Sequence, residues 1–251
     1  MARPDTSETD FGFRRVEAAE HTRLVRDVFD RVASRYDLMN DLMSGGVHRL
    51  WKSTLIAALN PRPGQVLLDV AGGTGDIARR FLARAGAGAG VILCDLTESM
   101  LRQGRDRAFD RGDLKGVDWV CGAAEALPIA DCSADAYTIA FGLRNVTGIP
   151  QALAEARRVL KPGGRFLCLE FSQVEIPVLK RAYDLYSFQV LPRLGAVVAR
   201  DREAYQYLVE SIRRFPSRRK LLSLMDQAGL EKTSVRPLSG GIAAIHSGWR
   251  L

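Results

Sequence analysis

The stretch VLLDVAGGTGDIA, residues 66–78, decides the fold of this chain. The apolar run that opens it ends in an acid, Asp69, and a loop of small residues at 71–75 follows. A helix is expected to begin near Asp76. The stretch therefore predicts a strand, a tight turn and a helix, the unit with which open α/β sheets bind nucleotides. The glycines of the loop permit positive φ angles and let a ligand approach the backbone closely.

A second acid, Asp95, ends the next apolar run at 91–94 and stands twenty residues after Gly75. At this distance from a glycine loop, a carboxylate can accept hydrogen bonds from the hydroxyls of a ribose. Asp95 therefore predicts a ligand that contains a ribose.

The charge of the loop indicates which nucleotide it takes. Gly73, Gly75 and Ala78 match the fingerprint of dinucleotide enzymes, so an NAD-dependent oxidoreductase is one reading. However, a carboxylate at Asp69 would repel a pyrophosphate that needs the helix N-terminus. The same carboxylate suits an ammonium group. S-adenosylmethionine carries an ammonium group, a cationic sulfur and a ribose but no phosphate, so we expect it as the cofactor, bound by Asp69, Gly73, Gly75 and Asp95.

Composition limits the other possibilities. The chain has 251 residues, 47% of them hydrophobic, and a net charge of +7. No apolar run approaches the roughly 20 residues that span a bilayer, and the polar N-terminus lacks the apolar segment of a secretion signal. The four cysteines and three histidines show no ligand spacing, so we expect no metal and a cytoplasmic location. Basic and aromatic residues are not interleaved, so no nucleic-acid partner is expected.

Strands and helices alternate along the middle of the chain. Strands are predicted at 66–70, 91–95, 117–121, 135–141 and 165–171, with helices at 76–85, 97–109 and 150–160 between them. This alternation predicts an α/β fold with a doubly wound, mostly parallel sheet. Two short runs at 232–236 and 242–248 would complete a seven-stranded, Rossmann-like sheet as an antiparallel pair at one edge.

We expect one domain, 1–251, of the class I methyltransferase type. Its segments are an N-terminal helical segment (1–60) that helps to form the substrate pocket, the cofactor-binding core (64–172), a helical insertion (174–215), and the last helix with the terminal strands (217–251). Residues 1–20 are expected to be a frayed or loosely docked lead. The insertion is expected either to cover the active site as a lid or to add to the core.

Ligands of open α/β sheets bind outside the carboxyl ends of the strands. Arg144 and Asn145 follow the central strand at 135–141, close to where the donor methyl group should point. An arginine can stabilise a developing phenolate, and an asparagine can orient a hydroxyl. These two residues are therefore the candidate catalytic residues, with a surface loop as the alternative.

Several longer segments match a known family. They are VFDRVASRYDLMNDLMSGGVHRLWK (28–52), LLDVAGGTGDIA (67–78), AFGLRNV (140–146), RVLKPGGRFLCLEFS (158–172), YDLYSFQVLPRLG (183–195) and the ending SGGIAAIHSGWRL. Over nearly its whole length the chain resembles the ubiquinone/menaquinone biosynthesis C-methyltransferases. The resemblance implies methylation of a ring carbon by S-adenosylmethionine. The substrate would be a 2-methoxy-6-polyprenyl-1,4-benzoquinol, a demethylmenaquinol, or both.

By motif position, the resemblance assigns further cofactor contacts to Thr74, Asp95, Ala123, Ala124 and Ala140. Two of these positions depart from the family pattern, which usually has Asn or Asp at position 123 and often Ser at position 140. Loss of one neutral hydrogen bond costs about 1 kcal/mol, so weaker cofactor binding is expected without loss of function.

The resemblance also implies that Arg144 and Asn145 position the ring oxygen of the substrate. The pocket would be completed by Tyr36, Asp37, Asn40 and His48, and the polyprenyl channel would be lined by Tyr183 and Tyr186.

The apolar insertion and the basic stretch Arg213–Lys220 predict peripheral contact with the inner face of a membrane. A homodimer and a quinone-biosynthesis complex are the protein assemblies considered. Three other functions stay open at this point: methylation of another small molecule or of RNA, NAD-dependent oxidoreduction, and a non-catalytic scaffold.

Overall fold

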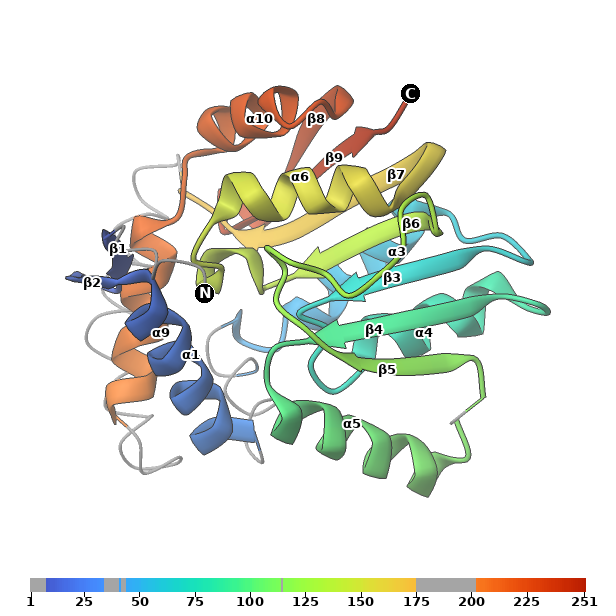
Figure 1. The fold of residues 1–251 in the computed structure, drawn as a ribbon, viewed down its shortest axis with the longest axis horizontal. Helices are drawn as coiled ribbons and strands as arrows, with labels where there is room; N and C mark the ends of the chain where they lie inside the picture. The colour runs from blue at the N-terminus through green and yellow to red at the C-terminus, as the bar shows by residue number, and fades with distance from the viewer. Residues whose placement is uncertain (1–7, 34–40, 42–43, 114, 175–201) are drawn as a thin grey trace, which may run out of the picture.

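A seven-stranded sheet forms the centre of the computed structural model, which describes residues 8–33, 41, 44–113, 115–174 and 202–251 (Figure 1). Its strands are β3 (Val66–Val70), β4 (Gly90–Asp95), β5 (Val117–Cys121), β6 (Ala134–Ala140), β7 (Leu160–Phe171), β8 (Glu231–Leu238) and β9 (Ala243–Trp249). They lie in the order β5-β4-β3-β6-β7-β9-β8. The first five in this order are parallel, whereas β9 is antiparallel to both β7 and β8. The predicted doubly wound, mostly parallel sheet is confirmed.

Helices cover both faces of the sheet. They are α1 (Ala18–Val32), α3 (His48–Leu59), α4 (Asp76–Ala85), α5 (Glu98–Arg111), α6 (Ile149–Val159), α9 (Arg202–Arg214) and α10 (Arg218–Gln227). Leu67 joins a core with α3 and α4, whereas its neighbour Leu68 joins a second core with α6 and α10 on the opposite face. Both strand faces are buried, which is why β3 reads as an unbroken apolar run in the sequence.

The glycine loop forms the predicted turn. Gly75 has φ +82° and directly precedes α4, which begins at Asp76 as expected. The loop after β6 packs against it so closely that a Cβ at Gly142 would collide with Ala71. The strand order reverses at β3, between β4 and β6, and such a reversal is where open α/β sheets form their ligand crevice.

The lead predicted to be frayed is ordered from residue 8 onward. An antiparallel hairpin forms from β1 (Glu8–Phe11) and β2 (Arg14–Glu17), and α1 begins directly after it, at residue 18. The prediction was wrong for residues 8–17 because the hairpin is held by tertiary contacts that its own sequence does not show. The ring of Phe11 stacks on Tyr207 of α9 at a centroid distance of 4.2 Å.

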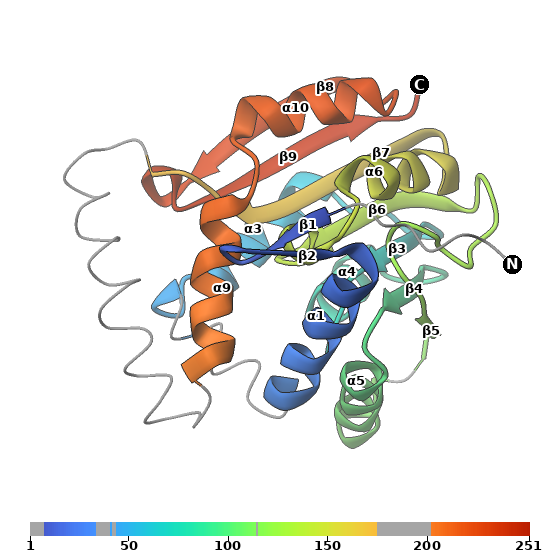
Figure 2. The ribbon, with the colours of Figure 1, turned by 60° about the vertical axis from the view of Figure 1, so that its left-hand side comes forward.

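The hairpin, α1 and α9 gather at the carboxyl edge of the parallel strands (Figure 2). Helix α9 is the part of the predicted insertion that the structure describes, whereas residues 175–201 lie outside the described residues. Helix α9 therefore lies at the edge of the sheet where open α/β sheets bind ligands (Figure 2).

Candidate functional site

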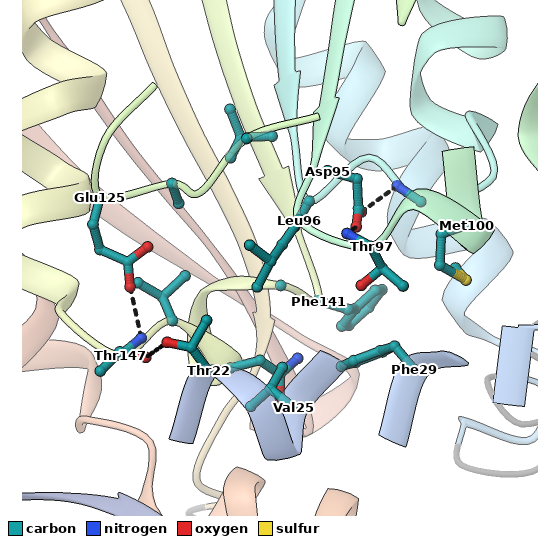
Figure 3. Close-up of a pocket in the computed structure, with 18 residues that line it drawn as sticks. Thr22, Val25, Phe29, Asp95, Leu96, Thr97, Met100, Glu125, Phe141 and Thr147 are labelled. Carbon is teal, nitrogen blue, oxygen red and sulfur yellow. Dashed lines mark hydrogen bonds between the residues drawn. The ribbon is translucent and has the colours of Figure 1, made fainter. Parts of the chain in front are cut away.

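A cavity that is partly open to solvent lies at the carboxyl ends of β3, β4 and β6. Its walls come from α1, the glycine loop, the end of β4 with the first turn of α5, and the loops after β5 and β6 (Figure 3). Five separate segments of the chain converge here, at the reversal point of the sheet.

Asp95 organises one wall of the cavity. Its two carboxylate oxygens accept hydrogen bonds from the backbone N–H groups of Gly73 and Thr97, each at 2.9 Å. Burial raises the pKa of Asp95, while these backbone hydrogen bonds act in the opposite direction. Each carboxylate oxygen has a further lone pair, so the group can hold the glycine loop and still accept from a ligand hydroxyl.

Small and apolar groups surround this carboxylate. Leu96, Met100, Gly122 and Ala124 line the cavity beside Asp95. A Cβ added to Gly73, which has φ +55°, would lie 3.1 Å from Met100 Cε. Because Gly73 has no side chain, an apolar space remains next to the two carboxylate oxygens of Asp95. This combination suits an adenosine, which has an apolar ring and ribose hydroxyls.

Asp69 is placed behind the glycine loop. Its Oδ1 accepts from the hydroxyl of Thr138 at 2.7 Å, its side chain is buried, and it is not among the residues that line the cavity. Its Oδ2 has no hydrogen-bond partner among the described residues. A Cβ at Gly72 would approach this oxygen to 3.0 Å. The unpartnered oxygen is therefore buried directly beneath the backbone of Gly72.

Burial raises the pKa of Asp69 to about 7, despite the hydrogen bond from Thr138 and the charge of Lys52, which lower it. In the unfolded chain this pKa is about 4. The folded protein thus holds a proton that the unfolded chain releases, and stability present below pH 4 is lost as the pH rises through 7.

Asp69→Asn should remove this loss. We expect the ligand-free variant to be more stable than the wild-type protein by about 3–4 kcal/mol at pH 8 and by only about 1–2 kcal/mol at pH 5, because three pKa units correspond to about 4 kcal/mol. Thermal unfolding at both pH values measures the effect. The exposed Asp113→Asn serves as the control and should show no such pH-dependent gain. An Asp69 variant that is equally destabilised at both pH values would contradict the assignment.

The first turn of α4 already carries a negative charge. Although burial opposes it, contact with Lys52 and Arg80 lowers the pKa of Asp76 to about 2. Its oxygens lie 3.1 Å from Lys52 Nζ and 2.9 Å from Arg80 Nε. A dinucleotide would place its pyrophosphate at this helix N-terminus. Asp76 occupies this position and is neutralised there by Lys52 and Arg80.

Arg144 is a buried ion-pair partner. It lies in the 3-10 helix η2 (Leu143–Asn145), and its Nη1 lies 3.1 Å from Oε2 of Glu170 at the end of β7. Both side chains are 1% exposed. Its Nη1 also donates to the carbonyl of Phe141, whereas Nε and Nη2 have no hydrogen-bond partner among the described residues. The alternative of an exposed surface loop is thereby excluded for Arg144.

Asn145, the next residue, does line the cavity. Its Oδ1 accepts from the hydroxyl of Tyr207 at 3.1 Å. The two candidate catalytic residues thus differ in position, since Asn145 faces the cavity and Arg144 lies behind it.

A polar corner completes the cavity. Glu125 Oε1 accepts from the backbone N–H groups of Thr147 and Gly148, at 2.8 and 3.1 Å. The hydroxyl of Thr147 is hydrogen-bonded to Thr22 at 3.1 Å (Figure 3). It is also hydrogen-bonded to Nδ1 of His21 at 2.8 Å. Helix α1 is anchored to the loop after β6 through these contacts.

The predicted site residues fall into two groups. Gly73, Asp95, Ala124 and Asn145 line the cavity. The others surround it without being among its lining residues: Asp69, Thr74, Gly75, Ala123, Ala140 and Arg144. His48 is buried in a different hollow together with Thr74. The predicted pocket and channel residues Tyr36, Asp37, Asn40, Tyr183 and Tyr186 lie outside the described residues.

Sequence reasoning assigned segment 1–60 to the substrate pocket but did not name the residues of α1 that line the cavity. Thr22, Val25 and Phe29 lie on one face of this helix and line the cavity. Their spacing of three and four residues was the available signal, but the sequence does not show what that face covers. Phe141 was also missed. It lines the cavity in the left-handed backbone region, with φ +58°, which is strained for an aromatic residue.

Solved structures share the architecture at low identity. A SAM-dependent methyltransferase from Aquifex aeolicus superimposes with a TM-score of 0.59 at 17% identity, covering 80% of this chain and 89% of that one. The [4+2]-cyclase SpnF gives a TM-score of 0.61 at 17% identity, covering 91% and 96%. The second neighbour carries a different activity in its name, so these likenesses establish the fold alone.

Full-length relatives are much more similar. Two of them are named ubiquinone/menaquinone biosynthesis C-methyltransferase UbiE, from Paracoccus denitrificans and Methylobacterium nodulans. Each is 59% identical, with 100% of both chains covered. The model of the ubiE/COQ5 methyltransferase family matches residues 16–250. A match over this span, on the predicted fold and with the predicted motifs, means that the chain belongs to the ubiE/COQ5 methyltransferase family.

Proposed function

We propose that the protein transfers the methyl group of S-adenosylmethionine to a ring carbon of a polyprenylated benzoquinol or demethylmenaquinol, a step of ubiquinone and menaquinone biosynthesis. The observation that carries this proposal is a single cavity lined by both Asp95 and Asn145. One residue suits the ribose of the donor, and the other suits an oxygen of the acceptor ring. The names of the relatives add the class of substrate.

The chemistry needs an electron-rich ring. Bound S-adenosylmethionine supplies an electrophilic methyl group on a cationic sulfur, which leaves with the C–S electron pair as a neutral thioether. The reduced ring loses a phenolic proton, which raises the electron density at the adjacent carbon. That carbon forms the new C–C bond, the ring carbon then releases its hydrogen as a proton, and the ring oxygen regains a proton. The net change is one methyl group gained by the ring and one proton released.

The protein's residues contribute position and charge. Asn145 holds the ring oxygen next to the donor. Arg144 acts from behind the cavity wall, where its buried guanidinium binds Glu170 and the carbonyl of Phe141 and so holds the loop that carries Asn145. Its positive charge is largely offset by Glu170 at 3.1 Å, so hydrogen bonding outweighs charge in this role.

Cofactor contacts follow the walls of the cavity. Asp95 accepts from the ribose hydroxyls, and the backbone of Gly73 lies against the methionine end. Leu96, Met100 and Ala124 pack on the adenine. Asp69 acts on the ammonium group from behind the glycine loop, since its unpartnered oxygen is buried and does not line the cavity. Thr74, Gly75, Ala123 and Ala140 shape the loops that support these contacts.

Membrane contact belongs to the same proposal. In the described part of the chain, no helix is long and apolar enough to cross a bilayer. A polyprenylated substrate resides in a membrane, so the enzyme collects it as a peripheral protein at the inner face. The basic stretch Arg213–Lys220, where α9 ends and α10 begins, and the insertion at 174–215 contact the lipid. The chain acts as one domain, alone, as a homodimer or in a biosynthetic complex.

A methylation assay tests the substrate class. With S-adenosylmethionine as donor, we expect methylation of reduced demethylmenaquinol or of the benzoquinol, and at least a tenfold loss of rate with the oxidised quinone, because only the hydroxyl form supplies a phenolate. Unmodified tRNA and NADH oxidation serve as controls for the other activities. Equal rates on reduced and oxidised rings, or methylation of RNA alone, would contradict the proposal.

A further inference from the structure

The hydroxyl of Tyr207 makes a hydrogen bond to Asn145, one of the two candidate catalytic residues. Tyr207 lies on α9, is 5% exposed, and donates from its hydroxyl to Asn145 Oδ1 at 3.1 Å. Burial raises the pKa of this phenol well above its usual range. Tyr207 therefore remains a protonated donor at every pH at which the enzyme is assayed.

This hydrogen bond decides which end of the Asn145 amide meets a ligand. An amide carries one acceptor oxygen and one donor NH₂ group. Because Tyr207 occupies the oxygen, the NH₂ group of Asn145 is left for a group in the cavity. A donor recognises an oxyanion more strongly than a neutral hydroxyl. The arrangement thus suits the deprotonated form of a ring oxygen.

The position of Tyr207 is itself fixed by the N-terminal hairpin. Three residues on one face of α9, Tyr207, Glu210 and Arg214, contact it. The ring of Phe11 stacks on Tyr207 with an interplanar angle of 17°, and the backbone N–H of Phe13 donates to Glu210 Oε2 at 3.0 Å. Arg214 lies 3.8 Å from the carboxylate of Asp10. The hydroxyl is therefore held in place from outside the cavity.

We propose that Tyr207 is a positioning residue for methyl transfer, which holds the Asn145 carbonyl so that the Asn145 amide donates to the ring oxyanion. The inference rests on the proposed function, because it needs a phenolic substrate at Asn145. It assigns Tyr207 no contact with the reacting atoms. Its effect passes through Asn145 alone.

Tyr207→Phe tests the role while keeping the ring that stacks on Phe11. We expect kcat to fall about tenfold at neutral pH, with the Kd of S-adenosylmethionine unchanged, since one hydrogen bond is lost away from the cofactor. The rising limb of the pH profile of kcat should move to higher pH by about one unit, because the oxyanion loses its oriented donor. A purely structural role would not shift this profile.

A double-mutant cycle decides whether the effect passes through Asn145. In an Asn145→Ala background, Tyr207→Phe should change kcat less than twofold. The matched control is Tyr137→Phe. Tyr137 is a buried tyrosine of β6 that stacks on Phe166 in the core beneath α6, and its loss of a hydroxyl should leave the pH profile unchanged.

The outcomes separate the two proposals. Two results would overturn the role of Tyr207 and leave the methylation of quinol standing. One is a tenfold effect of Tyr207→Phe that persists in the Asn145→Ala background. The other is an unchanged kcat and pH profile in the single variant. A wild-type protein that binds S-adenosylmethionine but methylates no quinol would overturn the proposed function, and the role of Tyr207 with it.

Discussion

Asp95→Ala is expected to raise the Kd of S-adenosylmethionine about a hundredfold. Two losses combine in this variant. The ribose hydroxyls lose an ionised acceptor, which is worth about 1.5–3 kcal/mol. In addition, the N–H groups of Gly73 and Thr97 lose the acceptor that ties the glycine loop to the first turn of α5. A total of about 3 kcal/mol corresponds to the expected change in Kd.

Calorimetric titration of the purified protein measures this effect. Asp95→Asn keeps one oxygen acceptor and should fall between the wild type and the alanine variant. Asp118→Ala, at an exposed position of β5, is the control and should leave the Kd unchanged. A Kd for Asp95→Ala within threefold of the wild-type value would remove Asp95 from the cofactor site.

Arg144→Ala is expected to lower the free energy of unfolding by about 3–5 kcal/mol, the cost of leaving one member of a buried ion pair unpaired. Glu170 would lose the cation that faces it, while its carboxylate keeps hydrogen bonds from the backbone N–H groups of Arg144 and Phe171. Burial already raises the pKa of Glu170, and Arg144 is the chief group that lowers it. Without Arg144, the pKa rises further above its unfolded value, so the loss of stability should grow from pH 5 to pH 8.

Urea unfolding at both pH values measures this loss, and Arg144→Ala combined with Glu170→Gln should recover part of it. For the fraction that remains folded, we expect lower turnover with the cofactor Kd within about threefold of the wild-type value. A loss of less than 1 kcal/mol in the free energy of unfolding would mean that the Arg144–Glu170 pair is not buried as the structure has it. A collapse of cofactor affinity would contradict the proposal that Arg144 acts on the substrate and not on the cofactor.

The cofactor half of the site could be predicted because it is local. Asp69, the glycine loop and Asp95 follow strands whose apolar runs are unmistakable, and the parallel sheet brings the ends of neighbouring strands together. Even so, Asp69 lies behind the loop, against Thr138, rather than at its mouth. The side chain of a strand residue points to one face of the sheet, and the run of letters does not say which face.

The other half of the site depends on contacts between distant segments. The burial of Arg144 follows from Glu170, 26 residues away, and the orientation of Asn145 follows from Tyr207, 62 residues away. The hairpin at residues 8–17 consists of two short, charged strands, and contacts with α9 hold it in place. No periodicity in these segments encodes the partner, so tertiary packing decides what propensity leaves open.

The proposed enzyme transfers a methyl group to a carbon atom of a reduced ring. An isotope label on that methyl group shows directly which atom of the ring receives it. The enzyme would be incubated with reduced demethylmenaquinol and S-adenosylmethionine carrying a ¹³C-labelled methyl group, and the product examined by NMR. We predict the label on a ring carbon, with both ring oxygens unmethylated. A labelled methyl ether, or no transfer by a protein that binds the cofactor, would contradict the account.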